Sequence, residues 1–152
     1  MPIIVARIDP RADKEDVVHL VREYFEWQKI PFESKNFEQE LNNRLTDLKQ
    51  RNGIILAKED GKVVGVGFYT IFKNFLGQDE CFFHKIITSK ADSFKKGIEE
   101  PIFREMMKYI KSIFGIGKFM FRSFESDMAY VSLLMKLGIK KTPDTLYEKK
   151  IE

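Results

Sequence analysis

The chain has 152 residues, of which 43% are hydrophobic and 32% charged, the balance of a single soluble globular domain, residues 1–152. Its net charge of +3 is too small to predict binding to nucleic acid, and no run of 18 apolar residues predicts a membrane span. The single cysteine, Cys81, excludes an internal disulfide and a cysteine-rich zinc site, and we predict no metal. We expect a cytoplasmic protein, because the apolar start of the chain meets Arg7 and Asp9 too soon for a signal peptide.

The first elements are a strand and two helices. The apolar run 3–8 predicts the strand. Asp13 is placed to cap the first helix, and Pro31 ends it. Asn36 and Gln39 have the spacing of a capping box, which predicts the start of the second helix. The apolar stripe of that second helix is Phe37, Leu41, Leu45 and Leu48.

Strands dominate the middle of the chain. The apolar runs 54–58 and 63–71 flank Asp60-Gly61, a strong signal for a β-hairpin. The run 80–88 predicts one further strand.

The last part alternates helices and strands. A helix follows Gly97 and ends at Gly115. We then expect a strand at 118–123, a helix at 127–137 and a final strand at 145–151. The resulting order, β-α-α-β-β-β-α-β-α-β, predicts an α/β fold with a mixed sheet and helices on both faces.

Several segments point to a known family. Residues 20–27 and 37–41 lie on the first two helices, and residues 53–65 give the hairpin the cadence A-x-x-x-G-x-x-V-G. Residues 136–139, Lys-Leu-Gly-Ile, close the last helix. In this order, the segments resemble small prokaryotic members of the GNAT superfamily of N-acetyltransferases, over nearly the whole chain.

The resemblance implies a V-shaped sheet with acetyl-CoA between the splayed strands 80–88 and 118–123. It also implies that backbone amides of the loop 93–99 bind the pyrophosphate, as helix N-termini bind anions. The cofactor-binding residues expected on this basis are Ile86, Ile87, Thr88, Lys95, Lys96, Gly97, Ile98 and Glu99.

The loop departs from the family pattern. Gly97 matches the first glycine, whereas Phe94 replaces a glutamine or arginine and Glu99 replaces a small residue. A carboxylate at position 99 repels a pyrophosphate, although Lys95 and Lys96 offset that charge. The alternative is that Gly97 merely starts an ordinary helix.

Acetyl transfer to an amine needs a polarised thioester oxygen, a base and an acid. Backbone amides near residues 86–88 are candidates for the first task. Glu80 and His84 are the candidate bases, because they share one face of strand 80–88 and histidine ionises near neutrality. The alternative is that Glu80 is a solvated strand end and His84 a hydrogen-bonded wall residue.

The resemblance predicts a tyrosine as the acid at the position of Leu134, which cannot donate a proton. Tyr130, one turn earlier, is the remaining candidate acid, unless it only packs in the fold. Phe25, Trp27 and Phe32 fit core positions and the wall of an acceptor pocket equally well.

We therefore expect an acetyl-CoA-dependent N-acetyltransferase that acetylates a primary amine, on a small molecule or a peptide, by direct attack. The alternative is a non-catalytic acyl-CoA-binding or regulatory protein of the same fold, which Phe94, Glu99 and Leu134 favour. A homodimer is compatible with either function.

Overall fold

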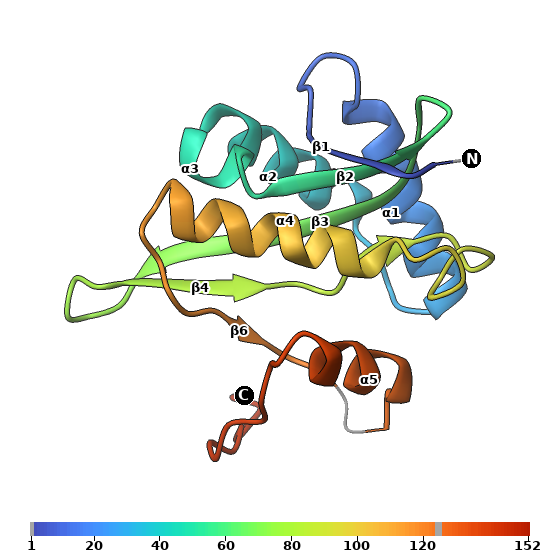
Figure 1. The fold of residues 1–152 in the computed structure, drawn as a ribbon. Helices are drawn as coiled ribbons and strands as arrows, with labels where there is room; N and C mark the ends of the chain where they lie inside the picture. Colours follow the sequence, from blue (N-terminus) through green and yellow to red (C-terminus); the bar gives the residue numbers. More distant parts are fainter. Residues whose placement is uncertain (1, 124–125) are drawn as a thin grey trace. The chain divides into compact units, whose positions relative to one another are not determined.

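The computed structural model describes residues 2–123 and 126–152, which form two units, Met1–Arg122 and Ser123–Glu152 (Figure 1). The first unit contains, in chain order, β1 (Ile4–Arg7), α1 (Lys14–Gln28), α2 (Ser34–Thr46), α3 (Leu48–Arg51), β2 (Ile54–Glu59), β3 (Lys62–Lys73), β4 (Asp79–Phe83), β5 (Ile87–Thr88), α4 (Glu99–Ser112) and β6 (Met120–Phe121). The second unit contains α5 (Met128–Lys136).

A six-stranded mixed sheet is the centre of the first unit. Strands β1, β2, β3 and β4 are antiparallel neighbours in that order, and β6 pairs with β4 in parallel. The short β5 also pairs with β3. The predicted α/β class with a mixed sheet is confirmed.

Strand β3 separates two layers of side chains. Helix α4 crosses one face of the sheet, whereas α1 and α2 cover the other (Figure 1). Gly65 and Gly67 face α4 so closely that a Cβ atom on either would lie 2.5 Å from Ile98 or Ile102, respectively. The alternate residues of β3 face α1 and α2, where the ring of Phe68 meets that of Phe37.

The hairpin between β2 and β3 forms as predicted. Asp60 and Gly61 have φ angles of 54° and 77°, the left-handed conformations that a two-residue hairpin turn requires.

Two predicted helix caps are wrong in detail. Helix α2 begins at Ser34, so Asn36 and Gln39 lie inside it and do not form its capping box. Asp13 occupies the N-cap position of α1, but its carboxylate accepts a hydrogen bond from the Asp9 N–H and pairs with Lys58 at 2.7 Å. A nearly buried carboxylate is costly unless it is paired with a cation, so this side chain pairs with the lysine and does not cap the helix.

The apolar stripe predicted for α2 extends past the observed end of the helix. The helix stops at Thr46, and the side chain of Asp47 accepts a hydrogen bond from the Lys49 N–H to start α3. Leu48 therefore belongs to α3 and is 66% exposed.

The predicted final strand, 145–151, is wrong. Residues 139–152 contain no helix or strand in the described second unit, and Leu146, Tyr147 and Ile151 are exposed. A strand needs a partner to satisfy its backbone groups, and the alternating sequence alone does not supply one. The strand predicted at 118–123 is reduced to β6, because its pairing with β4 extends over two residues.

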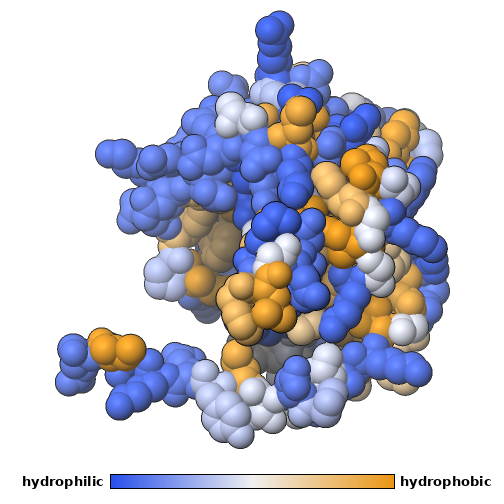
Figure 2. All heavy atoms as spheres, turned by 90° about the vertical axis from the view of Figure 1, so that its left-hand side faces the viewer, coloured by the Kyte–Doolittle hydropathy of each residue, from blue (hydrophilic) through white to orange (hydrophobic). Residues whose placement is uncertain are grey.

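The turn between β3 and β4 carries exposed apolar side chains. Phe75 is 96% and Leu76 65% exposed. Figure 2 views the molecule from this side, where hydrophobic atoms lie among hydrophilic ones. None of the helices in the described residues is both long and apolar enough to cross a membrane.

Candidate functional site

The predicted strand 80–88 is interrupted by a β-bulge. Phe83 of β4 pairs with Tyr69, and Ile87 of β5 pairs with Val66. Four steps along this strand therefore match three steps along β3, and one extra residue is inserted opposite Gly67. A bulge bends its strand and redirects side chains, and such bulges are frequent beside active sites.

Strands β4 and β6 part at this bulge. Their two residue pairs are Phe82 with Met120 and Phe83 with Phe121. Beyond these pairs β5 stays with β3, and within the described part of the chain it does not pair with β6. The arrangement agrees with the predicted separation of the two strands at one end.

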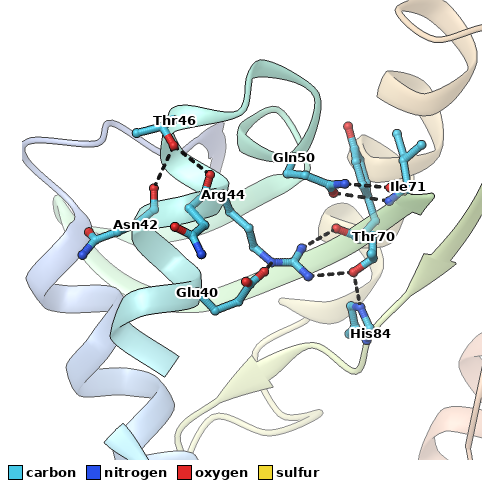
Figure 3. Close-up of polar contacts among 10 residues, drawn as sticks. Glu40, Asn42, Arg44, Thr46, Gln50, Thr70, Ile71 and His84 are labelled. Carbon is cyan, nitrogen blue, oxygen red and sulfur yellow. Dashed lines mark hydrogen bonds and ion pairs between the residues drawn. The ribbon is translucent and has the colours of Figure 1, made fainter. Parts of the chain in front are cut away.

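His84, the residue after β4, ends a chain of polar contacts (Figure 3). Its backbone N–H donates to the Phe68 carbonyl, and its Nε2 lies 2.7 Å from the Thr70 Oγ1 atom. Arg44 of α2 donates to the same Oγ1 at 2.8 Å and to the Tyr69 carbonyl at 2.9 Å.

The environment of His84 favours a neutral ring. Partial desolvation lowers the pKa of His84, and the guanidinium of Arg44 lowers it further. Glu40 forms an ion pair with Arg44 at 2.9 Å, which fixes the guanidinium. An imidazole that is neutral at neutral pH can accept a proton.

Glu80 lies at the other end of β4. Four residues along a strand correspond to about 13 Å, so Glu80 shares a face with His84 but not its surroundings. Glu80 lines a hollow of about 440 Å³ together with residues of the loop between α4 and β6, including Phe114 and Lys118. The structure thus separates the two predicted bases, and His84 is the one beside the bulge.

The loop before α4 is built around Glu99. Phe94 and Gly97 have φ angles of 56° and 66°, so two left-handed residues fold the turn back on the helix N-terminus. Glu99 is the first residue of α4 and is only 3% exposed. Its Oε2 atom accepts a hydrogen bond from the Phe94 N–H at 2.9 Å.

Three effects act on this carboxyl group, and together they raise its pKa above the ordinary value. Burial raises the pKa of Glu99, whereas hydrogen bonds from the N–H groups of Phe94, Glu99 itself and Ile98 lower it. The negative charge of Asp92 adds to the upward shift of the pKa.

The two lysines of the loop differ. The Nζ atom of Lys96 lies 3.1 Å from Glu59 and 3.2 Å from Asp92, so two carboxylates already compete for its charge. Lys95 is exposed, and its backbone N–H donates to the Asp92 carbonyl.

These observations test whether the loop fits the pyrophosphate of CoA. Gly97 fits, since the space beside its Cα atom is open. The amides do not fit, because the Glu99 carboxylate accepts the hydrogen bond of the Phe94 N–H and lies close to the N–H groups of Ile98 and Glu99. In this conformation, the loop does not fit a pyrophosphate.

The remaining residues predicted to bind cofactor are buried. Ile98 packs on Gly65 of β3, and Ile86 approaches Gly67. Ile87 and Thr88 form β5, and the carbonyl of Thr88 accepts a hydrogen bond from the Trp27 indole at 3.2 Å.

Tyr130 lies on α5 of the second unit, where its backbone N–H donates to the Asp127 carboxylate. Its role as an acid stays a prediction. Burial raises the pKa of the Cys81 thiol to about 12, so this cysteine is not a nucleophile at neutral pH.

Sequence reasoning missed Arg44, Thr70 and the hydrogen bond of Trp27. Arg44 occurs on the polar side of a helical stripe, where arginine is ordinary, and only the register of β3 brings Thr70 beneath it. Phe25 and Phe32 stack on each other at 5.0 Å and pack against the core.

The sequence matches no protein-family model, and a search of curated proteins finds no relative. Solved structures share its fold. An aminoglycoside N-acetyltransferase, AAC(6')-Iy, in complex with CoA has a TM-score of 0.77 at 10% identity, over 98% of this chain and 95% of that chain. A ribosomal-protein-alanine N-acetyltransferase from Brucella melitensis biovar Abortus 2308 has a TM-score of 0.71 at 14% identity, over 99% and 100% of the two chains.

A transcriptional regulator from Bacillus halodurans C-125 is also similar, with a TM-score of 0.73 at 15% identity over 98% of this chain and 100% of that chain. At identities this low, the structural similarity establishes the fold alone, and function must be argued from the site. The chain therefore has the fold of the GNAT acetyltransferases, as its sequence predicted.

Proposed function

We propose that this chain is an N-acetyltransferase that acetylates a primary amine without an acyl-enzyme intermediate, with His84 as the general base. The observation that carries the proposal is the contact chain from Arg44 through Thr70 to His84, at the residue that precedes the bulge. Activation of an amine requires a positioned base, and β-bulges are frequent beside active sites.

The ring nitrogens of His84 have different tasks in this proposal. With its Nε2–H donating to Thr70, His84 keeps a lone pair on Nδ1. That nitrogen takes the proton that the attacking amine loses. Arg44 holds Thr70, and desolvation together with the charge of Arg44 keeps the ring neutral before the reaction.

The acetyl donor in this proposal is acetyl-CoA, which supplies an activated thioester. The similar aminoglycoside N-acetyltransferase structure holds CoA, which supports this choice of donor. The occupied amides of the loop before α4 oppose it, and we assign no step to that loop. A small molecule and a peptide N-terminus both remain acceptor classes of the proposal.

The test is the rate of acetyl transfer from acetyl-CoA to a panel of primary amines. We expect His84→Gln to lower kcat/KM about 100-fold, the usual contribution of a positioned base. Glu80→Gln is the matched control, because it changes a residue on the same strand face, away from the bulge. Equal effects of the two substitutions would refute His84 as the base.

A second function is favoured by one specific observation. The Glu99 carboxylate that occupies the loop amides fits a non-catalytic protein of this fold with a binding or regulatory role. In that case, wild-type protein transfers no acetyl group to any amine of the panel.

A further inference from the structure

The N-terminus of α4 already has an anion. Glu99 is 3% exposed, and its carboxylate is turned back into the preceding turn, where Oε2 lies 2.9 Å from the Phe94 nitrogen. The N–H groups of Ile98 and Glu99 lie near enough to the same carboxylate to lower its pKa. One hydrogen-bonded amide and two nearby amides therefore face one side chain.

The backbone geometry explains this arrangement. Left-handed residues at Phe94 and Gly97 fold the turn back on the helix N-terminus, where the Phe94 N–H meets the Glu99 carboxylate. The first N–H groups of a helix lack partners within the helix and favour a negative charge. Here a side chain from the helix itself supplies that charge.

The surrounding charges give a second anion little support. Asp92 lies close enough to raise the pKa of Glu99, and Glu59 stands on the other side of Lys96. Lys96 bridges these two carboxylates at 3.2 and 3.1 Å. A pyrophosphate entering the turn would meet an occupied set of donors and a lysine that is already neutralised.

We infer that Glu99 is the resident anion of this turn and that its carboxylate excludes the pyrophosphate of CoA from the loop before α4. The inference concerns anion binding and does not rest on the proposed acetyl transfer.

The test compares the binding of inorganic pyrophosphate and of CoA by calorimetry. We expect the wild-type chain to show no binding of pyrophosphate at millimolar concentration. Glu99→Ala should bind pyrophosphate and should bind CoA about tenfold more tightly, because removing the carboxylate frees the donors and relieves a repulsion.

Glu100→Ala is the matched control. It removes the same charge from the same helical turn, but the carboxylate of Glu100 pairs with Arg104 at 3.2 Å. The control should leave both affinities unchanged. A gain as large as that of Glu99→Ala would mean that only overall charge matters, and would overturn the inference.

Glu99→Gln provides a second variant that keeps the volume of the side chain, should the alanine variant fail to fold. Thermal melting with and without pyrophosphate then reports binding through stabilisation, and we expect a shift for Glu99→Gln but not for the wild type. Pyrophosphate binding by the wild type as tight as by the variants would overturn the inference, as would folded variants that gain none.

These outcomes are separate from those of the acetyl-transfer assay. If the variants gain pyrophosphate binding but transfer no acetyl group, the inference holds and the proposed function fails. If the wild type binds pyrophosphate and transfers acetyl groups, the reverse is true.

Discussion

The two sides of the bulged strand treat a charged side chain in opposite ways. On the side of α2, Arg44 is held by Glu40 and the Tyr69 carbonyl, and it donates to the Thr70 hydroxyl that contacts Nε2 of His84. In the loop before α4, the carboxylate of Glu99 consumes the donors that a ligand would need. In the proposed function, the first network positions a base for a reaction, whereas in the further inference the second excludes a ligand.

This difference shows how far a fold constrains function. The fold matches solved acetyltransferases, with TM-scores of 0.71 and 0.77 for the two described above. In our inference, a single residue in the first turn of α4 nevertheless changes what the same backbone binds. Fold and site therefore have to be argued separately.

The largest effect we expect comes from the packing that places α4. A Cβ atom at Gly67 would lie 2.5 Å from the Ile102 Cγ2 atom and 3.0 Å from the Ile86 Cδ1 atom. Gly67→Ala should therefore lower the free energy of unfolding by about 1–3 kcal/mol, the usual effect of overpacking. Chemical denaturation measures this loss.

Gly117→Ala is the control, because a Cβ atom there meets no atom within 4 Å. Its stability should stay close to that of the wild type. Equal stabilities of the two variants would mean that α4 does not pack on β3 as closely as described. The position of the loop before α4, which depends on that packing, would then be wrong.

A smaller effect should appear in the pH dependence of the free energy of unfolding, through the titration of His84. The folded-state pKa of His84 lies below its value in the unfolded chain, so the unfolded state takes up the proton first on acidification. Stability should fall as the pH drops through about 6.5 and should stop falling below the folded-state pKa. Activity should lose its base over the lower part of the same range.

Arg44→Gln removes the nearby positive charge and should raise the pKa of His84 towards its ordinary value. NMR titration of the ring measures this shift directly. Arg44→Lys keeps the charge while it loses the paired hydrogen bonds, so it should leave the pKa lower than Arg44→Gln does. The same pKa in both variants would show that charge is not the cause.

Much of the fold could be predicted from the sequence because its signals are local. The Asp60-Gly61 turn, the stripe of α4 and the start of α5 at Asp127 all depend on neighbouring residues. The predictions that were wrong depend on contacts with residues elsewhere in the chain. The segment 145–151 alternates as a strand should, but alternation does not supply a partner edge.

The candidate site was predictable in position rather than in arrangement. The strand pattern predicts His84 as a candidate base, and the family resemblance predicts Glu99 in the cofactor loop. The hydrogen bonds that define their roles involve Thr70 and the backbone of Phe94, whose approach depends on strand register and left-handed geometry. Periodicity and spacing do not encode such contacts.

The central claim is that His84 acts as the base and that Glu99 excludes pyrophosphate from the loop before α4. It is tested most directly by substituting both residues in one protein. The measurement is kcat/KM for acetyl transfer from acetyl-CoA to an amine in Glu99→Ala and in the double variant Glu99→Ala, His84→Gln. We predict that Glu99→Ala exceeds the wild type and that the added His84→Gln lowers kcat/KM about 100-fold. Turnover that is equal in both variants, or no higher in Glu99→Ala than in the wild type, would contradict the account.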